Sequence, residues 1–257
     1  MCANCQLSAC CYYGDAMFKD KPTREAGQDV RTLPTYTIPE AAEYLGIDAW
    51  TLGSWYWGDQ PLLKPSGWYK GKIEGIALLS FQDLDEAYKL HLLRTKHDYP
   101  MQYLRKALAD ARRESKSDHP LLEHRFIVFD CLAMEKPGRG RRARKLIALG
   151  SVKPLYIPEV VETWGKRLVA DSKGYTKQIF PWRYAETDET SRPVSMQPDV
   201  LSGRLVVTGT RIPVSLLLGR QRSGEDIESI AKDFHLSANK VRQALMHIDK
   251  TIPKVAR

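Results

Sequence analysis

Apolar residues recur at helical spacing in two neighbouring segments near the C-terminus. Each segment places them at positions i, i+3, i+4 and i+7: first Ile227, Ile230, Ala231 and Phe234, then Val241, Ala244, Leu245 and Ile248. This spacing turns the apolar side chains of each segment to one face of a helix. His235 and Leu236 lie between the segments, and Ser237 can cap the second helix. The pattern predicts a helix–turn–helix.

The second of these helices has an outward face suited to reading DNA. Asn and Gln can bond adenine, Arg can bond guanine, and Lys can contact phosphate. The alternative is an ordinary exposed helix, where such residues are also common. We predict DNA contact through the cap and the polar face: Ser237, Asn239, Lys240, Arg242 and Gln243. His247 is expected on the same outward face.

A second helix–turn–helix is predicted near residue 40. Thr37 can cap a helix in which Pro39 fits the first turn and Glu40 lies three residues after the cap. Gly46 permits the left-handed exit that ends this helix, and Asp48 can cap the next one. In that next helix we expect Thr51 and Ser54 to contact DNA. The alternative is a helical scaffold that only packs.

A β wing and two further helices follow this motif. Residues 60–65 and 68–72 are expected to form the wing, with Lys70 and Lys72 as phosphate contacts. Helices are expected from Ser80 and after Pro100. In the stretch 36–113 this order resembles the DNA-binding domain of the MerR family, through TIPEAAEYLGI, LLKP, LSFQDL and LHLLR. Three tryptophans and a glycine stand where a groove-reading helix usually has Arg, Ser and Tyr: Trp50, Trp55, Trp57 and Gly53.

The middle of the chain alternates short strand-like runs with turns. Residues 126–132, 146–149, 168–171 and 175–180 are expected as strands, and residues 158–164 as a short helix. The whole chain is therefore predicted to be mainly α with small β elements. Its parts are a leader over 1–34, a winged helix–turn–helix domain over 35–116, an α+β module over 117–184, a linker over 185–192, and a C-terminal helix–turn–helix domain over 193–257.

Charge adds one more candidate surface. Lys and Arg number 39 against 31 Asp and Glu, so the formal net charge is +8. Six positive charges and no acid lie between Lys136 and Lys145, among Gly and Pro residues that favour a loop or mobile arm. We expect this arm to contact phosphate, with an acidic protein as the competing partner. Its predicted DNA contacts are Arg139, Arg141, Arg142, Arg144 and Lys145.

Several classes of function are disfavoured. The six histidines form no HExxH or HxH motif, and the acids have no spacing typical of a paired site, so we predict that the chain is not an enzyme. Cys2, Cys5, Cys10 and Cys11 are within reach of one zinc ion, but structural zinc sites usually separate their ligand pairs by a longer loop. We therefore expect no metal and no cofactor. No apolar run approaches a membrane span and no secretory signal is seen, so a cytoplasmic protein with no membrane partner is expected.

Residues 193–250 resemble a small helix–turn–helix family of unknown function. The resemblance rests on a P-x-V-x-x-G-[KR]-x-x-[IV]-x-G-T-R-[IV]-P-V signature followed by a G-E-x-I-E-x-I-A helix. The matching positions are Pro198, Val200, Gly203, Arg204, Val207, Gly209, Thr210, Arg211, Ile212, Pro213, Val214, Gly224, Glu225, Ile227 and Ala231. Gly203, Gly209, Thr210, Arg211 and Pro213 are taken as its structural motif, in which Arg211 can anchor a turn.

Taken with the MerR-like start, this chain resembles the longer VapB-type antitoxins of type II toxin–antitoxin systems. The resemblance implies an antitoxin that holds a PIN-like ribonuclease toxin inactive and represses its own operon by binding double-stranded DNA. It also implies a homodimer joined through the GTRIPV region. Two alternatives stay open: a MerR-like transcription regulator without a toxin partner, and a protein–protein adaptor.

Overall fold

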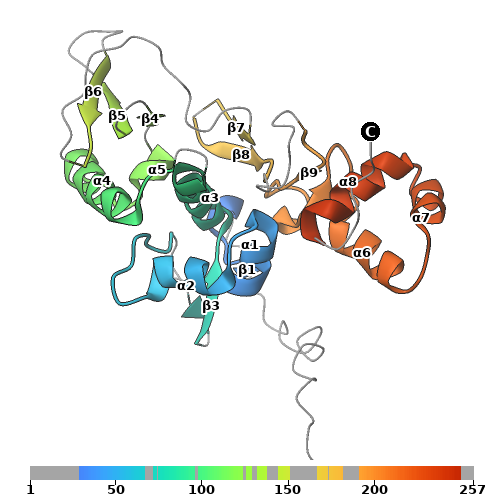
Figure 1. Ribbon diagram of the computed structural model, residues 1–257. Coiled ribbons are helices and arrows are strands. Elements are labelled where there is room, and N and C mark those ends of the chain that lie inside the picture. Colours follow the sequence, from blue (N-terminus) through green and yellow to red (C-terminus); the bar gives the residue numbers. More distant parts are fainter. Residues whose placement is uncertain are drawn as a thin grey trace, which may run out of the picture.

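The computed structural model consists of helices joined by small antiparallel sheets (Figure 1). This agrees with the mainly α class with small β elements. The structure describes residues 29–66, 72–73, 75–95, 98–123, 126–128, 132–137, 144–150, 167–172, 174–181 and 191–249. Within this part of the chain, no helix is long and apolar enough to cross a membrane.

The predicted N-terminal helix pair is present, with its caps. Strand β1 (Tyr36–Thr37) leads into α1 (Ile38–Leu45), and α2 (Ala49–Trp57) follows. The Thr37 hydroxyl accepts the Glu40 N–H at 3.4 Å, and Asp48 accepts the Thr51 N–H at 3.0 Å. Gly46 ends α1 with a left-handed φ of 69°.

A β hairpin follows the helix pair, in a different place from the predicted wing. Strands β2 (Lys72–Ile73) and β3 (Ile76–Leu79) pair around a turn at Gly75, and β3 also pairs with β1, in the order β1-β3-β2. Residues 60–65 form no strand, so that part of the wing prediction is wrong. Leu62 and Leu63 are buried instead, and their N–H groups bond the Trp55 carbonyl, which closes the segment onto α2. A MerR-type identity stays a prediction.

Helix α3 (Phe81–Thr95) runs through the centre of the molecule and is followed by α4 (Met101–Ser115) and α5 (Pro120–Glu123). Ser80 begins α3 as predicted, since its hydroxyl accepts the Asp83 N–H at 3.1 Å. Asp83, Asp85 and Glu86 of α3 are buried as well as its apolar residues. The helix is therefore enclosed rather than amphipathic.

The middle segment forms two separate small sheets. The run 126–132 was expected as one strand, but it divides between β4 (Phe126–Val128) and β5 (Leu132–Pro137). Strand β6 (Arg144–Ala148) pairs with β5, so the sheet has the order β4-β5-β6. The predicted hairpin of β7 (Leu168–Ala170) and β8 (Thr176–Ile179) is confirmed, with its turn at Gly174. The predicted helix 158–164 lies outside the described residues.

The C-terminal part joins a two-stranded sheet to three helices. Strands β9 (Val194–Ser195) and β10 (Val206–Val207) pair antiparallel, with the short helix η3 (Leu201–Gly203) between them. Helices α6 (Val214–Arg222), α7 (Ile227–Asp233) and α8 (Ala238–Ile248) follow. The predicted C-terminal helix pair corresponds to α7 and α8.

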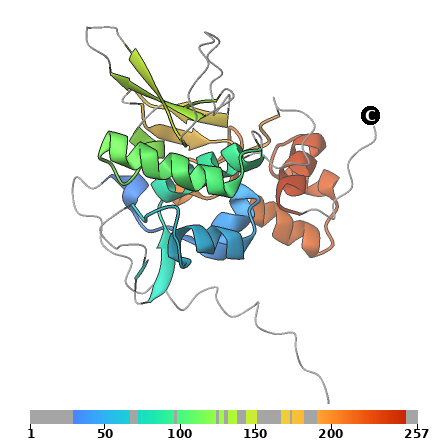
Figure 2. The ribbon, with the colours of Figure 1, turned by 60° about the vertical axis from the view of Figure 1, so that its left-hand side comes forward.

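One hydrophobic core runs through the N-terminal and C-terminal parts. Buried Tyr36 donates its hydroxyl to the Gly203 carbonyl at 2.9 Å. On α3, Tyr88 bonds the Phe180 carbonyl at 3.2 Å, and on α8, His247 bonds the Tyr44 carbonyl at 3.2 Å. Both ribbon views place α8 beside α1 (Figures 1 and 2). The two helix–turn–helix units therefore pack as one body, while the division into domains stays a prediction.

The segment before β1 is held against the β7–β8 hairpin. It forms the short helix η1 (Val30–Thr32), at the end of the predicted leader. Arg31 pairs with Asp29 at 2.7 Å and with Asp171 at 2.8 Å, and its guanidinium lies 5.0 Å from the centre of the Tyr175 ring. The pKa of Arg31 is raised, first by its hydrogen bond to Asp29. Residues 29–32 are thus attached to the β7–β8 hairpin.

Candidate nucleic-acid interface

Helix α8 presents a polar face as the sequence predicts. The Ser237 hydroxyl accepts the Lys240 N–H at 3.3 Å and starts the helix. Val241, Ala244 and Leu245 are buried against the core, while Asn239 and Gln243 are exposed. Exposed amides one turn apart on a helix are side chains of the type that reads base edges in the major groove, and base contact by Asn239 and Gln243 stays a prediction.

Two residues of the expected outward face lie elsewhere. His247 is buried, and its ring Nε2 lies 3.2 Å from the Tyr44 carbonyl, so the prediction that it faces outward is wrong. A carbonyl can only accept, which makes Nε2 the donor. Arg242 is half-buried and pairs with Glu228 of α7 at 3.2 Å. To bond a guanine, Arg242 would have to exchange this partner for the base.

Helix α7 and the turn after it are held by local hydrogen bonds and charge. Asp226 caps α7 by accepting the Ser229 N–H at 2.8 Å. At the end of α6, Arg220 pairs with both Glu225 and Asp233, which draws α6 and α7 together. His235 adopts a left-handed φ of 54°, and the Leu236 N–H bonds the Ala231 carbonyl at 2.8 Å, closing the turn. The turn therefore presents α8 to solvent at a set angle.

The GTRIPV segment is a tight turn built around Thr210. The Thr210 hydroxyl donates to the Val207 carbonyl at 2.8 Å and accepts the Ile212 N–H at 3.1 Å. Gly209 has a positive φ of 77°. Pro213 occupies the cap position of α6 and bridges to Val206. Arg211 is exposed and, among the described residues, has no hydrogen-bond or ion-pair partner, so Thr210 rather than Arg211 anchors the turn.

The predicted contacts on α2 lie in different surroundings. Thr51 and Ser54 are half-buried, and the Ser54 hydroxyl bonds the Thr51 carbonyl at 2.7 Å. Trp50 beside them is 81% exposed. Helix α2 contains no Lys or Arg, and residues 29–66 carry five acidic side chains against two basic ones. This charge balance is unfavourable for approach to phosphate. Base contact by Thr51 and Ser54 stays a prediction.

The remaining predicted contacts lie on or near hairpins. Lys72 is in β2, whereas Lys70 lies outside the described residues. Arg144 and Lys145 were expected in a loop, but they belong to β6 and pair with Pro137 and Lys136 of β5. Strand pairing thus extends further into the basic run than its Gly and Pro content suggested. Arg139, Arg141 and Arg142 lie outside the described residues.

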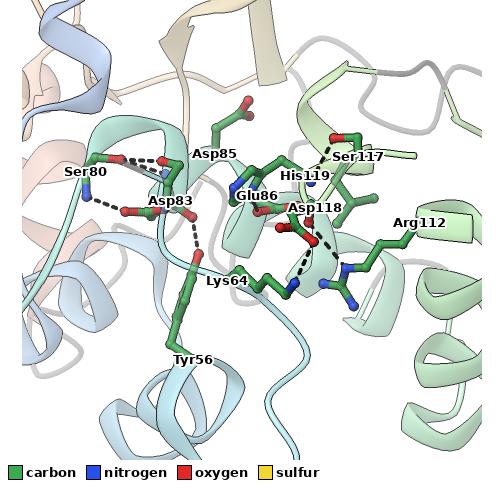
Figure 3. A network of polar contacts seen from close by, with 12 residues as sticks. Tyr56, Lys64, Ser80, Asp83, Asp85, Glu86, Arg112, Ser117, Asp118 and His119 are labelled. Atoms are coloured by element: carbon green, nitrogen blue, oxygen red, sulfur yellow. Dashed lines mark hydrogen bonds and ion pairs between the residues drawn. The ribbon is translucent and has the colours of Figure 1, made fainter. Parts of the chain in front are cut away.

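A buried polar network crosses the centre of the molecule, and the sequence analysis did not find it (Figure 3). Asp83 accepts the backbone N–H groups of Ser66 and Ser80 at 2.6 and 2.8 Å, and Tyr56 donates to its carbonyl at 2.7 Å. These bonds tie α2, α3 and the segment between them. The spacing Ser80-x-x-Asp83 was readable as a cap, but its burial was not.

The same network contains the pair of Glu86 and His119. The Glu86 side chain is fully buried, with Oε2 3.1 Å from His119 Nδ1 and Oε1 without a hydrogen-bond partner. Burial raises the pKa of Glu86, and the bond to Glu86 raises the pKa of His119 above its usual 6.5. Within the described residues, no group of three or more His, Cys, Asp or Glu is placed to hold a metal ion. The contact between Glu86 and His119 joins α3 to the residue before α5.

This pair predicts a pH dependence of stability. Because both pKa values are higher in the folded protein, it binds protons more tightly than the unfolded chain, and stability falls as pH rises through these values. We expect the melting temperature to fall by a few degrees between about pH 6 and about pH 8. Glu86→Gln keeps a hydrogen-bonding partner for His119 without the charge and should reduce this fall. Asp98→Asn is the control, since the Asp98 side chain is exposed and its ion-pair partner is Arg94 rather than Glu86 or His119. If the melting temperature of Glu86→Gln falls with pH as much as that of the wild-type protein, the Glu86–His119 pair is not the source of the pH dependence.

Comparison with known proteins supports the resemblance seen in the sequence. Residues 194–247 match the family model described as "Protein of unknown function (DUF433)". Over 230 residues the chain is 24% identical to a Mycobacterium tuberculosis (strain ATCC 25618 / H37Rv) protein named "Putative antitoxin VapB45", covering 83% of this chain and 93% of that one. The predicted resemblance to a VapB-type antitoxin is therefore confirmed.

A solved structure shares the fold. The X-ray crystal structure of Rv2018 from Mycobacterium tuberculosis superposes with a TM-score of 0.55 at 22% identity. The match covers 83% of this chain and 97% of that one. This likeness shows that the overall fold of the chain also occurs in a crystal structure.

Proposed function

We propose that this protein is a DNA-binding antitoxin that neutralises a PIN-like ribonuclease toxin and represses its own operon. Two findings support the proposal: a relative named as an antitoxin aligns with most of the chain, and α8 carries exposed amides on a capped, well-packed helix. The exposed amides of α8 are the observation that supports the DNA-binding part of the proposal.

We assign base reading to α8 rather than to α2. Asn239 and Gln243 are exposed on α8, with Lys240 beside them for a phosphate. Helix α2 instead carries an exposed indole and no Lys or Arg, so it offers no cation of its own to a phosphate.

We assign the toxin contact to the α1–α2 surface around Trp50. Large aromatic side chains are enriched at the centre of protein interfaces, where they fill pockets of the partner. Trp50 is 81% exposed, which leaves nearly all of its surface for such a contact. A toxin that acts on RNA has to present cationic surface to phosphate, and residues 29–66, which include α1 and α2, carry more acidic than basic side chains. The homodimer implied by the resemblance would use the GTRIPV turn, where Arg211 is exposed.

Co-expression with the protein encoded by the adjacent reading frame tests this function. We expect that protein to arrest growth alone, and the present chain to restore growth and co-purify with it. Trp50→Ala should weaken the complex by about 2 kcal/mol, roughly thirtyfold, and leave DNA binding unchanged. Leu216→Ala, at an exposed apolar residue of α6, is the control. A harmless neighbour that forms no complex would favour the regulator without a toxin; absence of operator binding as well would favour the adaptor.

A further inference from the structure

Helix α4 carries a basic stripe along its solvent side. Positions spaced three and four apart fall on one face of a helix, and six such positions on α4 and its C-cap are all exposed: Gln102, Arg105, Lys106, Ala109, Arg113 and Lys116. Four of the six are cationic and none is acidic. Since α4 has 15 residues, the stripe is about 22 Å long.

Both flanks of the stripe are fixed by neighbouring segments. On one side, Tyr103 donates its hydroxyl to the Leu149 carbonyl at 3.0 Å, and Asp110 accepts the Gly150 N–H at 3.0 Å, which attaches the end of β6 to α4. On the other side, Arg105 bonds the Gln60 carbonyl at 2.5 Å, and Arg112 bonds the Leu62 carbonyl. Helix α4 therefore cannot turn to bury the stripe.

The end of strand β6 is attached to the same helix. Strand β6 begins at Arg144, at the edge of the basic run 136–145, and the chain reaches α4 at Leu149 and Gly150. The ribbon views show the β5–β6 hairpin next to α4 (Figures 1 and 2). The strand that begins at the edge of this run is thus joined to α4.

The composition of the stripe indicates the partner. A protein interface of ordinary affinity has an apolar centre depleted of charge, whereas this stripe has Ala109 as its sole apolar member. Within the described residues, Lys106 and Lys116 have no ion-pair partner, and Arg113 pairs with Asp110 on the flank at 2.6 Å. Lys106 and Lys116 are therefore the two cations of the stripe that are available to contact the phosphates of a duplex without giving up a partner, while Arg105 and Arg113 already bond the Gln60 carbonyl and Asp110.

We propose that the α4 stripe binds the phosphate backbone of double-stranded DNA without regard to sequence, separately from base reading by α8. This inference rests on the proposed DNA-binding function and adds a second contact surface to it. Such contacts set affinity and position, while base-edge contacts set selectivity. Substitutions in the α4 stripe should therefore lower affinity without changing selectivity, and substitutions in α8 should lower selectivity.

The test uses the full chain with a mixed-sequence DNA duplex and with the DNA upstream of its own gene. We expect Lys106→Gln with Lys116→Gln to reduce the slope of log affinity against log salt by about 2, since each lost phosphate contact removes about 0.9. Affinity for both duplexes should fall by the same factor, so selectivity stays unchanged. The matched control is Lys177→Gln with Arg94→Gln, which also removes two exposed cations, from β8 and α3, and should leave the slope as it is.

The outcomes separate this inference from the proposed function. An unchanged salt slope in the Lys106/Lys116 variant, with selective binding intact, contradicts phosphate binding by the stripe. The stripe would then be assigned to an acidic protein partner. Loss of selectivity without a change of slope also overturns it. If the wild-type chain binds both duplexes equally and the variant lowers the salt slope, phosphate binding by the stripe is supported and selective binding of the operator by α8 is contradicted. All of these side chains are exposed, so an unchanged melting temperature should confirm that the variants fold.

Discussion

Replacing Gly203 by Ala is expected to destabilise the protein by about 3 kcal/mol. Gly203 has a φ of +83°, and the left-handed region costs a residue with a Cβ about 1–2 kcal/mol. An added Cβ would also lie 1.9 Å from the Tyr36 hydroxyl oxygen, closer than any real contact. Tyr36 would have to move out of the core and would lose its bond to the Gly203 carbonyl, worth about 1 kcal/mol.

Gly209→Ala is the matched control for this substitution. Gly209 has nearly the same backbone angle, φ +77°, but an added Cβ would meet nothing within 4 Å. Chemical denaturation should therefore show the strain alone in Gly209→Ala and strain plus clash in Gly203→Ala. Adding Tyr36→Phe to Gly203→Ala should recover part of the difference by removing the clashing oxygen. Equal losses in the two glycine variants would show that the contact with Tyr36 contributes little.

Substituting Asn239 and Gln243 by Ala is expected to abolish selective DNA binding. Each amide that bonds a base bidentately contributes about 1–3 kcal/mol of discrimination, so losing both should reduce selectivity by roughly 30-fold to 10⁴-fold. Binding to mixed-sequence DNA should persist, because phosphate contacts come from other residues. Competition between operator and mixed-sequence duplexes measures the ratio directly.

The control for this variant is Gln102→Ala on α4. It removes an exposed amide of the same type from a helix face without a predicted role in base reading. Selectivity should be unaffected. Arg242→Ala is informative in addition, because Arg242 pairs with Glu228 in the free protein. If Glu228→Ala strengthens selective binding, Arg242 exchanges its partner for a base; selectivity retained in the Asn239/Gln243 variant would contradict the assignment of α8.

The parts of the fold that were predictable from the sequence depend on local chemistry. The hydroxyl or carboxylate of Thr37, Asp48, Ser80 and Ser237 accepts an N–H three residues later in each case, as the spacing predicts. The stripes of α7 and α8 likewise follow from a period of 3.6 residues. A cap or stripe depends on residues a few positions apart, and this is the range over which sequence patterns carry information.

The parts that were missed depend on residues far apart in the chain. His247 has the spacing of an exposed residue, and its burial follows only from the packing of α8 on α1. Glu86 lies on the enclosed side of α3 because His119 supplies a partner from beyond α4. The wing was placed too early because residues 60–65 were interpreted as a strand, whereas Leu62 and Leu63 close onto α2.

The bond between Tyr36 and Gly203 joins residues 167 positions apart, and that between Tyr44 and His247 joins residues 203 positions apart. A growing chain on the ribosome cannot make either contact until nearly all of it has been translated. Until then, Tyr36 and Tyr44 of the first helix pair lack their C-terminal partners. Contacts of such long range slow folding and expose apolar surface in the meantime. Premature termination before α8 would release a product with an open core rather than a smaller folded domain. Cells should therefore clear such truncated products quickly, and the intact protein would emerge only as a complete unit.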